Sequence, residues 1–340
     1  MISLQSLFLL NLSSNSLSST INPDIGYMQG LEYLYLSNNS LTGPIPSSFH
    51  NLTKLTVLSL RQNFLNGPIP SGLSNLTMLN FLHFGSNSLT GSIPDELGRL
   101  RYLEYLHLDN NRFSLQPIHH FIYINILLMK RLTGPIPVSL SALRKLTLLS
   151  VQYNQLVGPI PASFSALGNL TILSLNNNQL TGTVPTTLSS LRKLQILQLQ
   201  SNRLRGSISG LFNSSLQQAL ANVDLSDNSF SGAIPPELFQ LPSLITVAAA
   251  VNCFSGRLPI TICEAKSINI ILFDGLSSAT SCQRRLWDPL NVITGYLANP
   301  MEGEIPSCVW ELSNLTTLHL SNRFYYFECY FVTSCFVIFK

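Results

Sequence analysis

Charged side chains are scarce in this chain of 340 residues, where Asp, Glu, Lys and Arg together make up 10% of the sequence. Soluble domains typically carry about 25% charged residues. The net charge is only +3, and the basic pairs Arg144–Lys145 and Arg192–Lys193 stand isolated from each other. Nucleic-acid binding requires clustered Lys and Arg, so we expect no nucleic-acid partner and interpret the pairs as solvated surface.

The sequence also lacks the short motifs that carry enzyme chemistry. It contains no GxxxxGK[ST] loop, HExxH helix, paired CxxC zinc pattern or nucleophile elbow. Ser190 and Lys193 have SxxK spacing, which is a weak signal by itself. His119 and His120 are adjacent, but neighbouring residues on a strand point to opposite faces, so they do not indicate a metal site. We therefore predict a non-catalytic protein with no cofactor and no metal.

What the sequence does contain is a repeat whose period is mostly 24 residues. Each repeat follows the pattern LxxLxLxxNxLxGxIP, as between Leu31 and Pro46. The aligned Asn residues are Asn15, Asn39, Asn63, Asn87, Asn111, Asn154, Asn178, Asn202, Asn228, Asn252 and Asn299. Self-similarity at a fixed period of this length predicts a solenoid in which each repeat forms one coil.

The LxL part of the pattern predicts a short strand with leucines on one face and variable residues on the other, because strand side chains alternate. A single repeat cannot bury its leucines, so the coils stack and the strands align as a parallel sheet along the inner curve. We expect each Asn to turn inward and to hydrogen-bond the backbone of neighbouring coils. Loss of one such Asn should cost about 1–3 kcal/mol.

The extended pattern xLxGxIPxxLxxLxxL resembles the plant-type leucine-rich repeats of receptor-like kinase ectodomains, receptor-like proteins and polygalacturonase-inhibiting proteins, and similar repeats occur in protist surface proteins. The resemblance covers roughly residues 1–322 with interruptions. It implies an α/β solenoid, a right-handed superhelix with a parallel sheet on the concave face and 3-10 or extended segments on the convex face.

The resemblance also implies a function. We expect a non-catalytic, receptor-like binding module that recognises a protein, peptide or glycan through the concave face, with a co-receptor as a further partner. The full-length protein is expected outside the cell or at the plasma membrane, attached only through parts missing from this chain. Two alternatives stay open, namely a secreted inhibitor of a cell-wall hydrolase and a structural or adhesive surface protein.

Interruptions of the repeat define the expected segments. Removing residues 113–131 restores the register between Asn111 and Asn154. We interpret this insert as translated intron, with a loop as the alternative, because long structureless insertions are uncommon in compact folds. We expect repeats in 1–112, 132–264 and 299–322, a degenerate repeat and loop in 265–298, and a non-repeat apolar tail in 323–340. Within the degenerate stretch, Ile268, Ile271 and Phe273 resemble a strand, and Ser277–Asp288 resembles an irregular loop.

The tail leaves the repeat beside Arg323–Phe324 much as the insert lies beside Arg112–Phe113, which suggests a common origin as intron sequence. A membrane anchor is the alternative, but a spanning helix needs about 20 predominantly apolar residues. The tail is shorter and contains Glu328. Because repeat positions begin by Leu7 and no cap is recognisable at either end, we expect the chain to be a fragment or a truncated gene product.

Sequons and cysteines are consistent with export. Seven N-x-S/T sequons occur, at Asn11, Asn38, Asn51, Asn75, Asn169, Asn213 and Asn314, although a repeat rich in Asn, Ser and Thr also generates sequons by chance. The cysteines cluster late in the chain, and four of them precede the tail. These four allow three disulfide connectivities, among which we expect Cys263 to pair with Cys282, while free thiols stay an alternative.

The exposed strand positions are the candidate binding face. In the first half of the chain they hold Tyr33, Tyr35, Arg61, Phe81, His83, Tyr105, His107 and Asp109. Aromatic rings and Arg often anchor interfaces, and Phe81 and His83 occupy the same repeat positions as Tyr105 and His107. The alternative is that aromatic residues are present only for their strand propensity. The second half presents smaller, neutral side chains, so we expect ligand binding in the first half.

Overall fold

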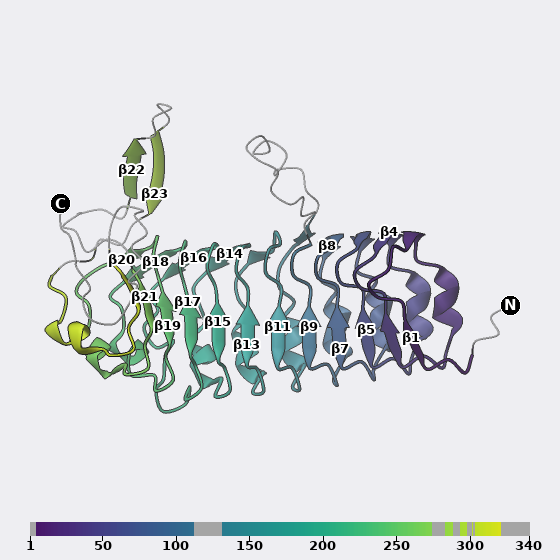
Figure 1. Cartoon of the computed structure of the whole chain (residues 1–340), viewed down its shortest axis with the longest axis horizontal. Helices are drawn as coiled ribbons and strands as arrows, with labels where there is room; N and C mark the ends of the chain where they lie inside the picture. Colours follow the sequence, from purple (N-terminus) through teal and green to yellow (C-terminus); the bar gives the residue numbers. More distant parts are fainter. Residues whose placement is uncertain are drawn as a thin grey trace. The chain divides into compact units, whose positions relative to one another are not determined.

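The structure is a computed structural model that describes residues 5–111, 131–273, 301 and 303–320, together with the backbone of 283–287 and 293–297. The chain divides into two compact units, unit 1 (Met1–Thr181) and unit 2 (Gly182–Lys340). Stacked coils of the same kind build both units (Figure 1). The insert 113–131, except Arg131, and the tail 323–340 lie outside the described residues.

Short parallel strands, one from each coil, form the main sheet of unit 1. In spatial order they are β1 (Leu9–Asn11), β3 (Tyr33–Tyr35), β5 (Val57–Ser59), β7 (Phe81–His83), β9 (Tyr105–His107), β11 (Leu148–Ser150) and β13 (Ile172–Ser174). Each strand pairs with the next at equivalent repeat positions, as Leu58 does with Leu82. The same register joins β9 to β11, where Leu106 pairs with Leu149, so the sheet continues across the insert.

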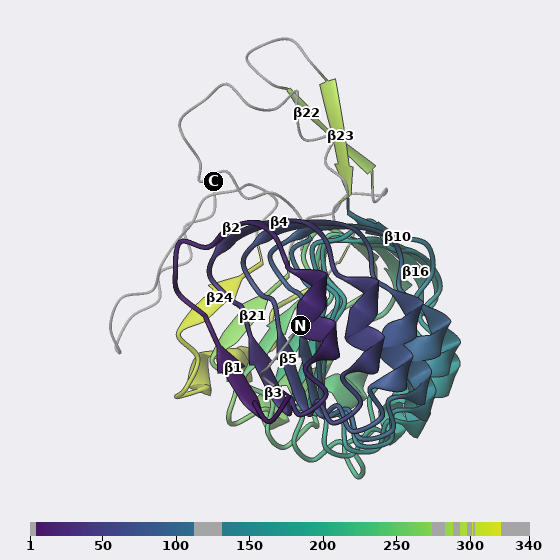
Figure 2. The same ribbon diagram turned by 90° about the vertical axis from the view of Figure 1, so that its right-hand side faces the viewer.

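Two further elements complete each coil of unit 1. The second strands are β2 (Ser18–Thr20), β4 (Ser40–Pro44), β6 (Phe64–Pro68), β8 (Ser88–Ser92), β10 (Leu132–Thr133), β12 (Val157–Gly158) and β14 (Gln179–Gly182, whose last residue begins unit 2). The 3-10 helices are η1 (Pro23–Tyr27), η2 (Ser47–Asn51), η3 (Ser71–Asn75), η4 (Asp95–Arg99), η6 (Val138–Ala142) and η7 (Ala162–Ala166). The strands of the main sheet, the second strands and the 3-10 helices lie on three different sides of the coils (Figure 2).

Unit 2 repeats this plan. Its main strands are β15 (Ile196–Gln198), β17 (Asn222–Asp224), β19 (Thr246–Ala248), β21 (Ile270–Leu272) and β24 (Thr317–His319). Its second strands are β16 (Arg203–Gly206), β18 (Ser229–Gly232) and β20 (Cys253–Phe254), and its 3-10 helices are η8 (Thr186–Ser190), η9 (Pro236–Leu238), η10 (Ile260–Glu264) and η11 (Ser307–Glu311). The predicted solenoid with a parallel sheet on one side and 3-10 segments on another is confirmed.

The degenerate stretch is more regular than its sequence indicates. The strand-like part forms β21, with Ile268, Ile271 and Phe273 buried. The expectation of an irregular loop over Ser277–Asp288 is wrong in part, because β22 (Gln283–Trp287) pairs antiparallel with β23 (Ile293–Leu297). The sequence of this hairpin does not follow the leucine spacing of the repeat, so the repeat pattern did not predict these two strands.

Aligned Asn side chains connect successive coils. The Asn63 Nδ2 donates to the carbonyl oxygens of Leu36 at 2.9 Å and Leu60 at 3.1 Å, and its Oδ1 accepts from the Leu41 N–H at 3.0 Å. Asn63 is 6% exposed, so these bonds satisfy backbone groups that water cannot reach. Equivalent bonds occur at Asn39, Asn87, Asn154, Asn178, Asn228 and Asn252.

Asn15, the first residue of the ladder, is exposed and bonds within its own coil, to the Leu12 and Ser13 carbonyl oxygens. Asn111 donates to the Leu108 carbonyl oxygen and accepts from the Leu89 N–H of the preceding coil. Asn202 donates to the Leu199 carbonyl oxygen of its own coil. Asn299 lies outside the described residues.

A disulfide links two 3-10 helices of unit 2. Cys263 on η10 is bonded to Cys308 on η11, with Cα atoms 5.7 Å apart. The predicted pairing of Cys263 with Cys282 is therefore wrong, because the coils that carry η10 and η11 are neighbours although the two cysteines are 45 residues apart in the sequence. Cys253 is also disulfide-bonded. Among the described residues, no helix is long and apolar enough to span a lipid bilayer.

Candidate ligand-binding face

The outward positions of strands β3, β7 and β9 carry six aromatic or imidazole side chains, which we call the aromatic face: Tyr33, Tyr35, Phe81, His83, Tyr105 and His107. They flank the central strand leucines, as at Leu82 and Leu106, which are 0% exposed. Strand alternation explains this arrangement, since the leucine side chains fill the coil and their neighbours point to solvent. Each side chain of the face is half-buried or exposed.

Four side chains of the aromatic face contact one another. The Phe81 ring centroid lies 5.8 Å from those of both Tyr105 and His107, and 5.9 Å from that of His83. Such tilted and edge-on ring pairs are favourable beyond the area that they bury. The parallel pairing of β7 with β9 sets these neighbours opposite each other. Tyr33 and Tyr35 lie on β3, separated from the cluster by β5, whose outward residues are Val57 and Ser59.

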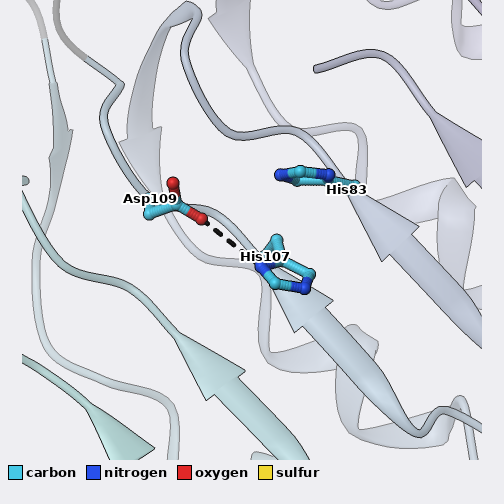
Figure 3. A group of neighbouring side chains, drawn as sticks. All are labelled: His83, His107 and Asp109. Carbon is cyan, nitrogen blue, oxygen red and sulfur yellow. Dashed lines mark ion pairs between the residues drawn. The ribbon is translucent and has the colours of Figure 1, made fainter. Parts of the chain in front are cut away.

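Charged groups accompany this cluster. Asp109 lies two residues beyond His107, and its Oδ1 is 3.6 Å from the His107 Nδ1. His83, His107 and Asp109 each offer a donor atom, and these atoms lie within 4.8 Å of one another (Figure 3). The exposed Arg61 follows β5 at the repeat position that Gly85 and Asp109 occupy in the next two coils.

The environment sets the charge of these groups. Burial, together with the charges of the neighbouring His107 and Arg61, lowers the pKa of His83 to about 4, against the opposing effect of Asp109. Burial alone would raise the pKa of Asp109, but its interactions with His107 and His83 outweigh burial and hold that pKa below its usual value. At neutral pH, His83 is therefore an uncharged imidazole beside an ionised carboxylate.

Comparisons with known proteins agree with this architecture. The leucine-rich-repeat family models match residues 144–204 and the single repeats 30–52, 54–76, 78–100 and 219–241. The chain is a leucine-rich-repeat protein. No curated protein matches it.

Solved structures extend the similarity over most of the chain. The ectodomain of the receptor kinase GASSHO1/SCHENGEN3 from Arabidopsis thaliana, in complex with CASPARIAN STRIP INTEGRITY FACTOR 2, superimposes with a TM-score of 0.75 at 33% identity, over 92% of this chain and 35% of the ectodomain. The plant peptide hormone receptor RGFR1 in complex with RGF2 superimposes with a TM-score of 0.72 at 30% identity, over 94% of this chain and 48% of the receptor chain. A plant ice-binding protein superimposes with a TM-score of 0.61 at 27% identity, over 74% of each chain. The chain thus spans less than half the length of the two receptors.

The leucine-rich-repeat face of unit 2 differs in chemistry. Its outward strand positions include Gln198, Asp224 and Ala248. Asp224 is mostly buried, and burial raises its pKa although its Oδ1 accepts the Ser226 N–H at 3.0 Å. This part of the face offers hydrogen-bonding groups but, among its described outward residues from β15 to β21, no aromatic ring.

The predicted glycosylation sites lie on several sides of the coils. Asn11, Asn38, Asn75 and Asn314 are exposed, and Asn51, Asn169 and Asn213 are half-buried. Asn11 ends β1 and pairs in register with Tyr35, so a glycan there would lie beside the aromatic face. The other exposed sites follow the strands or lie on or after 3-10 helices.

The repeat pattern placed these residues on the outward side of the strands, but it did not predict that three of their donor groups lie close together. His83, His107 and Asp109 were predicted as separate ligand contacts, whereas the structure brings their donor atoms together. A signal was available, because two His residues one repeat apart are followed two residues later by an acid. It was missed because the direction of each side chain and the space at Gly85 are not visible in the repeat pattern.

Proposed function

We propose that this chain is the recognition part of a receptor-like protein and that it binds an extended peptide on the aromatic face of unit 1, outside the cell. The observation that carries the proposal is the contact cluster of Phe81, His83, Tyr105 and His107 on two strands paired in register. A preformed cluster of rings on a rigid sheet loses little conformational freedom when a ligand binds, which favours affinity.

Residue chemistry supports a peptide over other ligands. Tyrosine and arginine are enriched among the residues that dominate binding energy at protein interfaces. Tyr105 is 37% exposed and Arg61 is exposed beside the ring cluster, so apolar and charged anchors are offered together. We expect the peptide to place an apolar side chain against the rings and a carboxylate against Arg61, because a guanidinium binds carboxylates in a bidentate manner.

The solved relatives support the same class of ligand. The two receptors are in complex with CASPARIAN STRIP INTEGRITY FACTOR 2 and, for the peptide hormone receptor RGFR1, with RGF2, and they share 33% and 30% identity with this chain. This chain spans 35% and 48% of the two receptor chains.

Selection from a random peptide library displayed on phage tests the proposal. The full chain, produced by secretion so that its disulfides form, is the bait. We expect enriched peptides that carry an aromatic or branched apolar residue near an acidic residue, and expect their capture to fail with a Phe81→Ser/Tyr105→Ser variant. The matched control is Ile172→Ser/Ile196→Ser, which removes apolar side chains from the same strand position elsewhere. Absence of enrichment, or equal capture by the Phe81→Ser/Tyr105→Ser variant, would overturn the proposal.

A second candidate is an ice-binding role, because the plant ice-binding protein matches this chain over 74% of each sequence at 27% identity. The same purified chain can be tested for inhibition of ice recrystallisation. Activity that survives the Phe81→Ser/Tyr105→Ser substitutions would favour this candidate over peptide recognition.

A further inference from the structure

Three donor groups converge at one edge of the ring cluster. His83 ends β7 and His107 ends β9, and the two residues are paired directly across the sheet. Asp109 follows on the same side of the chain as His107, and the donor atoms of the three residues lie within 4.8 Å of one another. The sheet therefore holds two imidazoles and one carboxylate facing a common point (Figure 3).

We propose that His83, His107 and Asp109 bind one divalent transition-metal ion of the zinc class. Imidazole and carboxylate are ligands that such ions prefer. Donor atoms on one zinc ion lie about 3.3 Å apart, given metal–ligand distances of about 2.0–2.1 Å and tetrahedral geometry. The donor atoms now lie within 4.8 Å of one another, so the three side chains must rotate toward one another when an ion binds.

Gly85 supplies the space that the carboxylate uses. A Cβ atom at this position would lie 2.9 Å from Asp109 Oδ2 and 3.0 Å from Oδ1, so the carboxylate would have to shift from its place. The backbone of Gly85 is not among the positive-φ glycines, so its conformation does not require glycine. The coils on either side carry Arg61 and Asp109 at this position. Glycine at this position thus leaves the carboxylate of Asp109 in its present place over the Gly85 backbone.

The surroundings favour metal binding in one respect and oppose it in another. Phe81 packs against both imidazoles, with ring centroids 5.9 and 5.8 Å away, and so restricts their rotation. The charge of Arg61 opposes a cation, although its side chain is exposed and can turn into solvent.

Two consequences follow from three protein ligands. At least one coordination position stays open, as in zinc sites with three protein ligands and a water molecule. Because all three ligands are half-buried and not fully enclosed, we expect a ligand carboxylate or imidazole to be able to replace the water molecule. Metal binding itself does not rest on the proposed peptide function, since it requires only the three side chains.

Cobalt(II) titration followed by visible absorption tests the site, because cobalt(II) replaces zinc and its spectrum reports coordination number and ligand type. The full chain is used with its disulfides intact and with His119→Ala/His120→Ala substitutions, which remove the adjacent imidazoles of the insert. We expect one cobalt ion per chain, a spectrum without thiolate bands, and displacement by zinc.

Substitutions separate this site from other metal-binding groups. We expect His83→Ala, His107→Ala and Asp109→Ala each to abolish one-to-one binding. Gly85→Ala, which keeps all ligands but displaces the carboxylate, should weaken binding about 10–100-fold, and Arg61→Gln should strengthen it. His50→Ala is the matched control, because His50 is a half-buried imidazole on η2 bonded to the Ser47 carbonyl oxygen, and it should leave binding unchanged.

The result is decisive in either direction. No binding, or one-to-one binding that persists in His107→Ala and Asp109→Ala, would overturn the metal site. Because Gly85→Ala removes no ligand, it keeps the test informative if a histidine variant fails to fold. Peptide capture is measured with Phe81→Ser/Tyr105→Ser, which retains all three metal ligands, so failure of one proposal is distinguishable from failure of the other.

Discussion

The imidazole rings of His83 and His107 lie 4.4 Å apart, centroid to centroid, on neighbouring strands in register. This distance is close to the strand spacing of a parallel sheet, about 4.8 Å, because both residues lie on paired strands and not on loops. A repeat that places His at the same strand position in two successive coils therefore brings two imidazole rings side by side, here tilted by 42°. The sheet acts as a rigid support on which the variable positions become a surface.

The Asn ladder should account for a measurable part of the stability. We expect Asn63→Ala to lower the free energy of unfolding by about 1–3 kcal/mol, because it leaves the Leu36 and Leu60 carbonyls and the Leu41 N–H without the Asn63 partner. Asn15→Ala is the control, since Asn15 is exposed and bonds only within its coil. Urea unfolding followed by circular dichroism gives both values. Equal loss at the two positions would contradict the role of the ladder.

The disulfide assignment predicts a specific mass-spectrometric result. Proteolysis without reduction should yield a peptide that joins Cys263 to Cys308. Breaking this bond with Cys263→Ser/Cys308→Ser should cost about 2–4 kcal/mol of unfolding free energy, because the crosslink restricts the unfolded chain. A peptide that joins Cys263 to Cys282 would contradict the structure and restore the expectation from sequence.

The buried carboxyl of Asp224 predicts a dependence of stability on pH. Burial raises its pKa in the folded state above the ordinary value of 3.8, so the folded state binds the proton more tightly than the unfolded state does. This contribution favours the folded state at low pH and is lost as pH rises through the folded pKa. We expect Asp224→Asn, which keeps an oxygen for the Ser226 N–H, to raise the melting temperature at pH 7.

A matched comparison isolates the carboxyl. The advantage of Asp224→Asn should shrink as the pH falls toward 3.8, where the wild-type carboxyl becomes protonated. The substitution Asp227→Asn, near Asp224 but in the turn after β17, is the control. An Asp224→Asn effect that is the same at pH 4 and pH 7 would show that burial of the charge is not its cause.

The sequence predicted the solenoid because its period is visible locally. The leucines around Leu58 and Leu82 repeat every 24 residues, and each strand needs only its neighbour to pair. Even the 26-residue step between Asn202 and Asn228 leaves the register intact, since Leu197 still pairs with Val223. Because each repeat contacts only its neighbours, the pattern of a single repeat is enough to predict the fold.

The features that the sequence did not reveal depend on distances between side chains. Cys308 is paired with Cys263 because two coils stack, and the irregular stretch between them hides that relation. The grouping of His83, His107 and Asp109 depends on side-chain direction and on the absence of a Cβ at Gly85. The hairpin of β22 and β23 follows neither the leucine spacing nor the Asn ladder.

One measurement tests most directly whether the aromatic face of unit 1 is the binding surface. It is the affinity of an enriched library peptide for three forms of the chain. Isothermal titration calorimetry compares the wild type, Phe81→Ser/Tyr105→Ser and the control Ile172→Ser/Ile196→Ser. We expect a loss of about 2 kcal/mol or more of binding free energy, roughly 30-fold in Kd, for Phe81→Ser/Tyr105→Ser and an unchanged Kd for the control. An unchanged Kd for Phe81→Ser/Tyr105→Ser, in a chain that circular dichroism shows to be folded, would contradict the claim.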